Sequence, residues 1–236
     1  MKKNIIYLAL AGVLLIQNGC TEQYLNPSAA SQPQVVGSAD GLITVCNSLL
    51  YRYSVGGASS IIASTVTASG LTTGELTVLN QGNGEEFALQ QGQANVTNTN
   101  SVVRNIWTQS QLLRSNADLI LANTSVVNDP GTQSGIIAYA SIFRALALGT
   151  MATFFQSAPI VTGENSPFVE RADLLKQAIA SLETAATLVA ANPVSANFTS
   201  KVPAGIDIPN TIQALIARYA LMAGDLDKAL AAANKV

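Results

Sequence analysis

Residues 209–236 read PNTIQALIARYALMAGDLDKALAAANKV, and this stretch predicts a pair of short antiparallel helices. Small alanines stand where the two helices must approach each other, and Gly224-Asp225 supplies a tight turn between them. Asn210, followed three residues later by Gln213, has the form of a capping box at the start of the first helix. We therefore expect helices at 210–223 and 226–235.

This helix pair resembles a tetratricopeptide hairpin, a unit that cannot bury its apolar face alone. Such hairpins normally stack against neighbours on both sides. Because the sequence ends at Val236, we expect the apolar face of the last helix to lie open. Either the chain is a fragment of a longer protein, or residues 226–236 find a partner elsewhere.

The remainder of the chain is also predicted to be mainly helical. Alanine, the strongest helix former, becomes frequent beyond residue 137, and Asp173 has the side chain of an N-cap. Apolar residues at three- and four-residue steps predict two helices in the first half. By contrast, Ser, Thr and Gly at 53–74 predict a loop with short ordered pieces, and Asn and Gln at 80–100 predict an irregular, solvent-facing segment. The helices expected before the terminal pair are 39–53, 103–122, 132–155 and 173–191.

The composition excludes several classes of function. The 236-residue chain has 12 Lys and Arg against 14 Asp and Glu, no His, two Cys, and 11% charged residues. Nucleic acid binding has no physical basis, because a net charge of −2 provides no basic surface for phosphates. The absence of His removes the His-based nucleophile systems and the commonest metal ligand. Two Cys cannot form a Cys-rich zinc site, so we predict no metal site.

The motifs of common catalytic and cofactor-binding sites are also missing. The sequence contains no Walker A motif, dinucleotide-binding glycine fingerprint or G-x-S-x-G elbow, and we predict no cofactor. Acid–base chemistry would then depend on carboxylates. Glu85 and Glu86 are adjacent in a polar segment and are typical of a solvated pair. Glu170, Arg171 and Asp173 cluster at an expected helix start, where capping and the helix dipole explain acidic residues. We therefore predict no catalytic residue.

Aromatic residues are candidates for stacking on sugar rings, because an aromatic face matches the C–H surface of a pyranose. The candidates are Trp107, Tyr51, Tyr53, Phe154 and Phe155. Trp107 lies on the apolar stripe of its helix and is expected in the core. Phe154 and Phe155 end a helix just before a proline-containing loop, where one of the pair can be exposed. The sequence alone assigns none of them to a ligand.

The N-terminus has the form of a bacterial export signal. Two lysines precede a twelve-residue apolar run from Ile5 to Ile16, which is shorter than the about 20 residues of a transmembrane helix. Gly19 directly before Cys20 resembles a lipoprotein cleavage site, although Gln17 stands where such signals usually have an aliphatic residue. We expect residues 1–19 to be removed and Cys20 to carry lipid.

The second cysteine, Cys46, then remains as a single thiol in an expected helix. A lone Cys is more often a small buried hydrophobe than a reactive group. A Cys20–Cys46 disulfide is the alternative if Cys20 is not lipidated, because an exported compartment permits disulfides. Residues 20–38 contain Pro27, Pro33 and Gly37 and predict an irregular tether.

Several segments, in order along the chain, resemble the SusD/RagB family of outer-membrane nutrient-binding lipoproteins. The family begins with a lipidated Cys followed by an aromatic-Leu pair and a Pro, as in Cys20 and Tyr24-Leu25-Asn26-Pro27. A family helix with a Trp and a downstream Asn-Ala step is similar to Trp107 and Asn116-Ala117. The further matches are Ala140 and Arg144-Ala145 before Ala158-Pro159-Ile160, Arg171 in PFVERADLLKQAIASLETA, and Ala214, Ala217-Arg218, Gly224-Asp225 and Ala229 in the terminal helix pair.

The resemblance implies an all-α fold of tetratricopeptide-like helical hairpins with long irregular loops, covering 39–236 and incomplete at the C-terminus. It implies a lipid-anchored protein, exposed at the outer membrane, that captures an oligosaccharide or peptide nutrient. The implied partner is a SusC-like TonB-dependent barrel, for which the protein acts as lid. In this family, Arg144 and Arg171 are expected to make structural helix-end or interhelix hydrogen bonds.

Two features depart from the family pattern. Phe155-Gln156-Ser157 replaces the Tyr and Gly often found before the proline loop, and family members are usually about twice as long. The missing half commonly supplies much of the ligand cleft, so specificity does not transfer. Two other functions stay open: a periplasmic tetratricopeptide-type scaffold for proteins, and a small carboxylate-dependent glycosidase that needs an acid–base pair.

Overall fold

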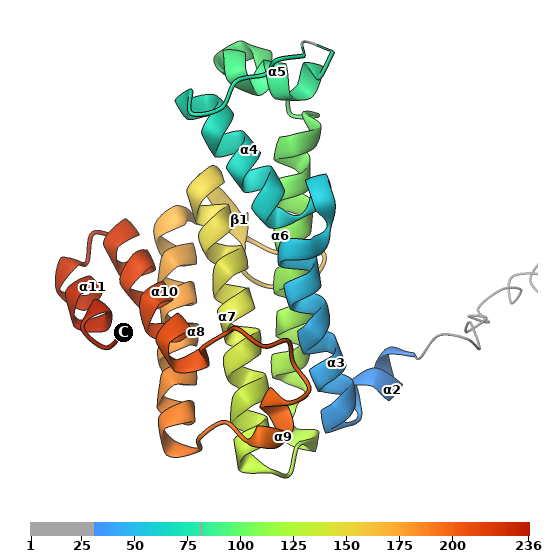
Figure 1. The fold of residues 1–236 in the computed structure, drawn as a ribbon, viewed down its shortest axis with the longest axis vertical. Helices are drawn as coiled ribbons and strands as arrows, with labels where there is room; N and C mark the ends of the chain where they lie inside the picture. The colour runs from blue at the N-terminus through green and yellow to red at the C-terminus, as the bar shows by residue number, and fades with distance from the viewer. Residues whose placement is uncertain (1–30, 81) are drawn as a thin grey trace, which may run out of the picture. The chain divides into compact units, whose positions relative to one another are not determined.

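Helices make up most of the part of the chain that the structure describes, and the predicted all-α class is confirmed (Figure 1). This computed structural model describes residues 31–80 and 82–236. The predicted signal segment 1–19 and Cys20 lie outside the described residues. The helices are α2 (Gln32–Val36), α3 (Ala39–Leu50), α4 (Ile61–Thr73), α5 (Gly84–Gln91), α6 (Ser101–Ala122), α7 (Pro130–Phe154), α8 (Arg171–Ala191), α9 (Ala196–Thr199), α10 (Ile208–Met222) and α11 (Leu226–Ala233), and the strands are β1 (Ser157–Pro159) and β2 (Phe168–Glu170).

Long helices lie side by side in the unit formed by Val35–Val236. Figure 1 shows α6, α7, α8, α10 and α11 in this order across the view, and each packs on the next. Helices α10 and α11 are the predicted terminal hairpin, with Gly224 at φ +81° in the turn between them. This backbone conformation favours glycine, which explains how the chain reverses so tightly there.

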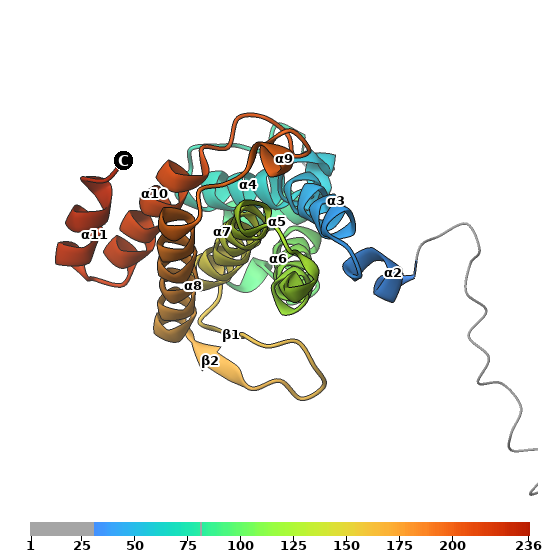
Figure 2. The same ribbon diagram turned by 90° about the horizontal axis from the view of Figure 1, so that it is seen from below.

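Helix α7 is buried on nearly all sides and forms the centre of the core. It contacts α3, α6, α8, α9 and α10. Figure 2 shows α3 and α9 on one side of α7 and the β1–β2 hairpin on the other. Helices α7 and α8 both have the length and apolar composition of a membrane span, but the most apolar window of α7 is 78% buried among its neighbours and that of α8 33%. An all-round apolar helix such as α7 therefore serves here as a core helix.

Two glycines of α7 let aromatic rings approach its backbone. A Cβ atom at Gly149 would overlap the ring of Tyr219 on α10, and a Cβ atom at Gly135 would lie 2.6 Å from the ring of Phe198 on α9. Carbon atoms in contact are normally about 3.5–4 Å apart. The rings of Tyr219 and Phe198 thus occupy the space that a larger residue of α7 would need.

Two predicted helix caps are wrong. Helix α10 begins earlier than expected, because the side chain of Asp207 accepts a hydrogen bond from the backbone N–H of Asn210 at 3.1 Å. A proline in the first turn is tolerated there, since its missing N–H would have no partner in the helix. Helix α8 also begins earlier, directly after strand β2, so Glu170 is the N-cap residue and Asp173 lies in the first turn.

The predicted loop at 53–74 is also wrong, because most of this segment forms α4. Ser60 caps the helix by accepting a hydrogen bond from Ala63 N–H, and Thr72 Oγ1 donates to the carbonyl of Ala68 at 2.7 Å. Local hydroxyl bonds of this kind satisfy Ser and Thr inside a helix. The buried side chain of Leu71 packs with residues of α6, so tertiary contacts outweigh the weak helix propensity of the segment.

Other short elements were also not predicted from the sequence. Within the expected loop at 80–100, α5 forms because Leu89 joins the buried cluster that contains Leu71 and Ile106. The expected tether at 20–38 contains α2 in its described part, and the turns of α9 and the strands β1 and β2 were not predicted. The predicted helices 39–53, 103–122, 132–155, 173–191, 210–223 and 226–235 correspond to α3, α6, α7, α8, α10 and α11, with ends that differ by a few residues.

We predict that Gly149→Ala lowers the free energy of unfolding by about 1–3 kcal/mol, the usual cost of overpacking a core. The added methyl group would overlap the ring of Tyr219, which has to shift within a closely packed interior. Urea unfolding followed by circular dichroism measures the change. The control is Gly84→Ala, because a Cβ atom there meets no other atom within 4 Å. Equal stability of the two variants would contradict the prediction.

Candidate functional site

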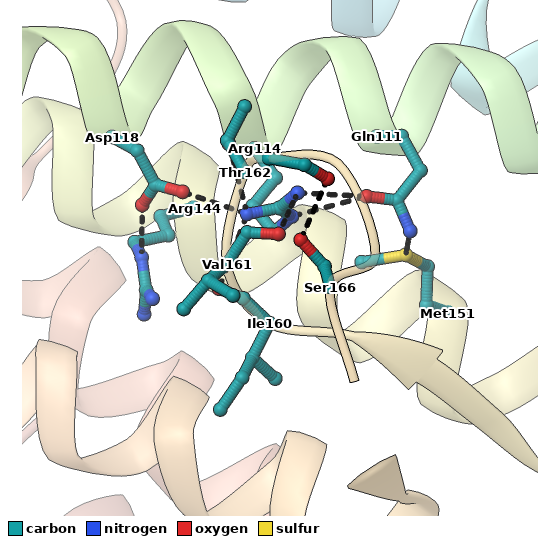
Figure 3. Close-up of polar contacts among 10 residues, drawn as sticks. Gln111, Arg114, Asp118, Arg144, Met151, Ile160, Val161, Thr162 and Ser166 are labelled. Atoms are coloured by element: carbon teal, nitrogen blue, oxygen red, sulfur yellow. Dashed lines mark hydrogen bonds and ion pairs between the residues drawn. The ribbon is translucent and has the colours of Figure 1, made fainter. Parts of the chain in front are cut away.

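One face of α6 carries polar and aromatic side chains toward the β1–β2 hairpin. Trp107, Gln111, Arg114 and Asp118 follow one another at steps of four, three and four residues, which places them on the same side of the helix. Figure 3 shows the side chains of Gln111, Arg114 and Asp118 beside the loop between the strands. We call these four residues together with the hairpin 157–170 the hairpin site.

Arg114 is the centre of the hairpin site. It is 3% exposed, and its guanidinium donates hydrogen bonds to the backbone carbonyl oxygens of Ile160 at 3.1 Å and Val161 at 3.2 Å. It also donates to Thr162 Oγ1 at 3.3 Å and, from Nε and Nη2, to Gln111 Oε1 at 3.1 and 3.0 Å. The planar guanidinium offers five donors in fixed directions. One buried side chain thereby fixes the loop of the hairpin to α6.

Asp118 lies between two arginines from different helices (Figure 3). Its carboxylate accepts hydrogen bonds from Nη1 of Arg114 at 2.8 Å and from Nε of Arg144 on α7 at 2.7 Å. Burial lowers the pKa of Arg114, and the charge of Asp118 opposes this change. The predicted structural role of Arg144 is confirmed, since this side chain joins α7 to α6. Both carboxylate oxygens are engaged, so Asp118 is a structural anchor in this arrangement.

The hairpin carries an aromatic ring that the sequence analysis did not consider. Strands β1 and β2 pair antiparallel, with Ser157 opposite Glu170 and Pro159 opposite Phe168.

Gln111 extends the hydrogen-bond network of Arg114 to α7, because its side-chain amide nitrogen donates to the sulfur of Met151. The hairpin is therefore held at its loop, while Phe168 stands on the strand that leads into α8.

Trp107, Phe155 and Phe168 form an aromatic cluster at the other end of the hairpin site. The ring of Trp107 meets Phe155 edge to face, with centroids 4.9 Å apart, and stacks on Phe168 with centroids 5.8 Å apart and planes 14° apart. Trp107, which was expected in the core, is partly buried and packs against the core from outside. Phe168 is 62% exposed, so its ring presents a large apolar surface to solvent.

The hairpin site is suited chemically to binding. Its two charged groups on α6, Arg114 and Asp118, pair with each other. Its cluster of rings supplies an apolar surface in a fixed position. Within residues 31–80 and 82–236, no group of three or more His, Cys, Asp or Glu is placed to hold a metal ion. The surface can therefore recognise the apolar face of a ligand through contact with Phe168.

The hairpin site contains only two of the five predicted aromatic candidates, Trp107 and Phe155. Tyr51 and Tyr53 lie on the π-helical turn Tyr51–Val55 that follows α3. The ring of Tyr53 packs edge to face on a core phenylalanine of α7, and Tyr51 is exposed. Phe154 packs against the smaller core cluster between α4, α5 and α6.

The acidic candidates are dispersed over different helices. Glu85 is more than a solvated residue, because its Oε2 accepts a hydrogen bond from the backbone N–H of Ser101 at 2.7 Å, at the start of α6. Asp173 lies 3.9 Å from Lys176 on the surface of α8. The side chain of Arg171 is exposed at the start of α8 and makes no hydrogen bond within the described part of the chain, unlike the expected helix-end or interhelix hydrogen-bonding role.

Cys46 is fully buried, as predicted for a small hydrophobe. Burial raises the pKa of its thiol to about 12, so the side chain stays protonated and unreactive at neutral pH. The lipidation site predicted at Cys20 lies outside the described residues, and so does one end of the alternative Cys20–Cys46 disulfide.

Sequence reasoning missed Arg114, Asp118 and Phe168. The signal for the first two is the spacing from Trp107, which puts an arginine and an acidic residue on one helix face at i and i+4. Arg114 also adjoins the apolar stripe through Leu113 and Ala117, so its burial can be anticipated. No local signal identifies Phe168, because its stacking on Trp107 depends on the register of the hairpin.

We predict that Arg114→Met lowers the free energy of unfolding by about 2–4 kcal/mol, because it leaves the partly buried carbonyl oxygens of Ile160 and Val161 without this donor and Asp118 with one partner fewer. Amide hydrogen exchange should accelerate throughout the hairpin 157–170. Urea unfolding and exchange mass spectrometry measure the two effects. The control is Lys176→Met, which removes a largely exposed charge. Unchanged exchange in the hairpin of Arg114→Met would contradict the anchoring role.

Comparison with known proteins gives few matches. A scan against models of protein families finds no match, and neither does a search of the curated proteins. Among solved structures, the crystal structure of a SusD-like carbohydrate-binding protein from Bacteroides fragilis is similar, with a TM-score of 0.48 and 18% sequence identity. The similarity covers 74% of this chain and 39% of that chain, so this chain spans less than half the length of that protein.

Proposed function

We propose that the protein is a non-enzymatic nutrient-binding lipoprotein of the cell surface, which captures an oligosaccharide for a SusC-like TonB-dependent barrel. The observation that carries the proposal is the exposed ring of Phe168, stacked on Trp107. An aromatic ring with one accessible face matches the C–H surface of a sugar ring. Amphipathic ligands of this kind are recognised by an apolar platform with polar groups around it.

Rigidity of the hairpin favours this use of Phe168. The side chain of Arg114 ties the loop of the hairpin to α6, and Trp107 supports the ring from the side of the helix. A ligand therefore meets a surface that is already ordered, and binding loses less conformational entropy. Arg114 and Arg144 are paired with Asp118, and Glu164 and Glu170 of the hairpin are exposed acidic residues that repel an anion, which favours a neutral sugar ring there over an anionic one.

The proposed attachment to the cell surface rests on the N-terminal sequence. We propose that residues 1–19 are the export signal, that Cys20 carries the lipid, and that 20–38 is a tether to the binding domain 39–236. The order of the SusD/RagB-like motifs supports the barrel as partner and the outer membrane as location. A peptide nutrient in place of an oligosaccharide is the alternative ligand.

A protein-interaction scaffold in the periplasm is the second candidate function. The observation that favours it is the apolar surface of the terminal hairpin, where Leu221, Leu226 and Leu230 are each more than 60% exposed. A groove of about 710 Å³ between α8 and α10 adds further apolar surface. Exposed apolar patches of this kind often mark protein interfaces.

We predict that Phe168→Ala weakens binding of a neutral oligosaccharide about tenfold, equivalent to about 1.4 kcal/mol. Isothermal titration of the full chain against a panel of neutral oligosaccharides measures the dissociation constants. The control is Leu226→Ala, which removes an equally exposed apolar side chain from α11. The prediction fails if no member of the panel binds, or if both variants bind like the parent protein.

We predict that the tagged full chain, isolated with detergent from outer membranes, retains a TonB-dependent barrel in stoichiometric amount. Mass spectrometry of the bound proteins and of the N-terminal peptide identifies the partner and the lipid on Cys20. Recovery of periplasmic proteins in its place, together with protection from protease on intact cells, would favour the scaffold. An N-terminal peptide without lipid would contradict the proposed anchor.

A further inference from the structure

A second surface feature lies apart from the hairpin site. A cleft of about 240 Å³ is bounded by the turn Tyr51–Val55 and by α4, α7 and α10. Its polar lining includes Tyr53, Ser69, Thr150 and Arg218, and Tyr219 forms part of its wall. None of its lining residues belongs to α6 or to the hairpin 157–170. We call this feature the Arg218 cleft.

The Arg218 cleft gathers polar groups whose hydrogen-bonding capacity is unused. The hydroxyl groups of Tyr53, Ser69, Thr150 and Tyr219 make no hydrogen bond within the described part of the chain, and neither does the guanidinium of Arg218. Each hydroxyl can both donate and accept, whereas the guanidinium only donates. Five such groups from four elements therefore converge on one small space.

Packing holds the aromatic walls of the cleft in place. The ring of Tyr219 lies against α7 in the space left by Gly149. The ring of Tyr53 meets that of Phe143 edge to face, with centroids 6.0 Å apart. Burial raises the pKa of both tyrosines, so their hydroxyl groups stay neutral and able to donate near pH 7. The polar groups are thus presented by a fixed frame.

The charge of the cleft comes from Arg218, since neither Asp nor Glu is among the residues that line it. Elsewhere in the described chain, arginines such as Arg114 and Arg144 are paired with a carboxylate. A guanidinium binds a carboxylate through two parallel hydrogen bonds, which makes the pair both strong and directional. The volume is below the roughly 300–1,000 Å³ of pockets for drug-sized ligands, so the cleft suits a single sugar residue.

We propose that the Arg218 cleft binds a carboxylate-bearing sugar residue, such as a hexuronic acid, of an oligosaccharide. This inference rests on the proposed function, and it adds a substrate class: chains that carry an acidic sugar. The carboxylate pairs with Arg218, and the sugar hydroxyls exchange hydrogen bonds with Ser69, Thr150 and the two tyrosines. A peptide carboxylate can also pair with an arginine, but it leaves these hydroxyl groups without partners, so a sugar fits the cleft better.

The test compares two trisaccharides of the same linkage, one of galacturonic acid and one of galactose, by titration into the full chain at neutral pH. The parent protein should bind the acidic trisaccharide about tenfold or more tightly than the neutral one. In Arg218→Gln the two dissociation constants should become equal. Arg218→Lys should give an intermediate preference, because an ammonium group is a point charge without the paired donors.

The matched control is Arg104→Gln. Arg104 is also an exposed arginine without a hydrogen bond in the described part of the chain, and it lines a different cleft. This variant should keep the full preference for the acidic trisaccharide. An unchanged preference in Arg218→Gln overturns the proposal, and so does equally tight binding of a short peptide whose C-terminal carboxylate competes for the cleft.

The outcomes also separate this inference from the proposed function. Binding of neutral sugars that depends on Phe168, without any effect of Arg218, overturns the acidic subsite and leaves oligosaccharide capture in place. The absence of binding by every saccharide overturns both. Circular dichroism of each variant checks its fold, and the exposed position of Arg218 makes its replacement compatible with an intact core.

Discussion

Close approach of helices to α7 is the constraint on which the rest of the helical unit depends. Helices α3, α6, α8, α9 and α10 all need a place on its surface, and rings from two of them lie where glycines leave room. Interiors pack as densely as organic crystals, so a ring and a side chain cannot share the same space. The small residues of α7 thereby decide how near its neighbours come, and with that the position of every surface they carry.

The buried charged side chain of Arg114 orders the loop of the hairpin 157–170. The hairpin 157–170 has only a short pair of strands, which is marginal in isolation. Arg114 compensates by donating to its loop, and the cost of burying that guanidinium is offset by Asp118 and by hydrogen bonds to carbonyl oxygens. Arg144 then couples the same network to α7. Phe168 owes its fixed position to this chain of polar contacts as much as to Trp107.

The sequence predicts the long helices well and the short elements poorly, for physical reasons. Apolar periodicity and alanine content reveal α6, α7 and α8, because a buried stripe leaves its mark over many turns. Helix α4 carries no such stripe, and contacts with α6 stabilise it. At the hairpin site, Trp107 and Phe155 can be identified as candidates from their residue type. Their contact with Phe168 cannot be predicted, because it depends on the register of the strands and on the loop that Arg114 holds. Arg114 is forty-six residues away from Ile160, whose carbonyl oxygen it binds.

The end of α7 joins two surfaces through consecutive residues. Phe154 lines the Arg218 cleft, and Phe155 packs on Trp107 beneath the hairpin. Surfaces fixed to one helix do not move independently, so under the proposed function a saccharide held at one is presented to the other at a high effective concentration. A chain long enough to reach both gains avidity that two weak contacts cannot provide singly. The protein then selects ligands in which the two recognised groups are separated by about the width of one helix.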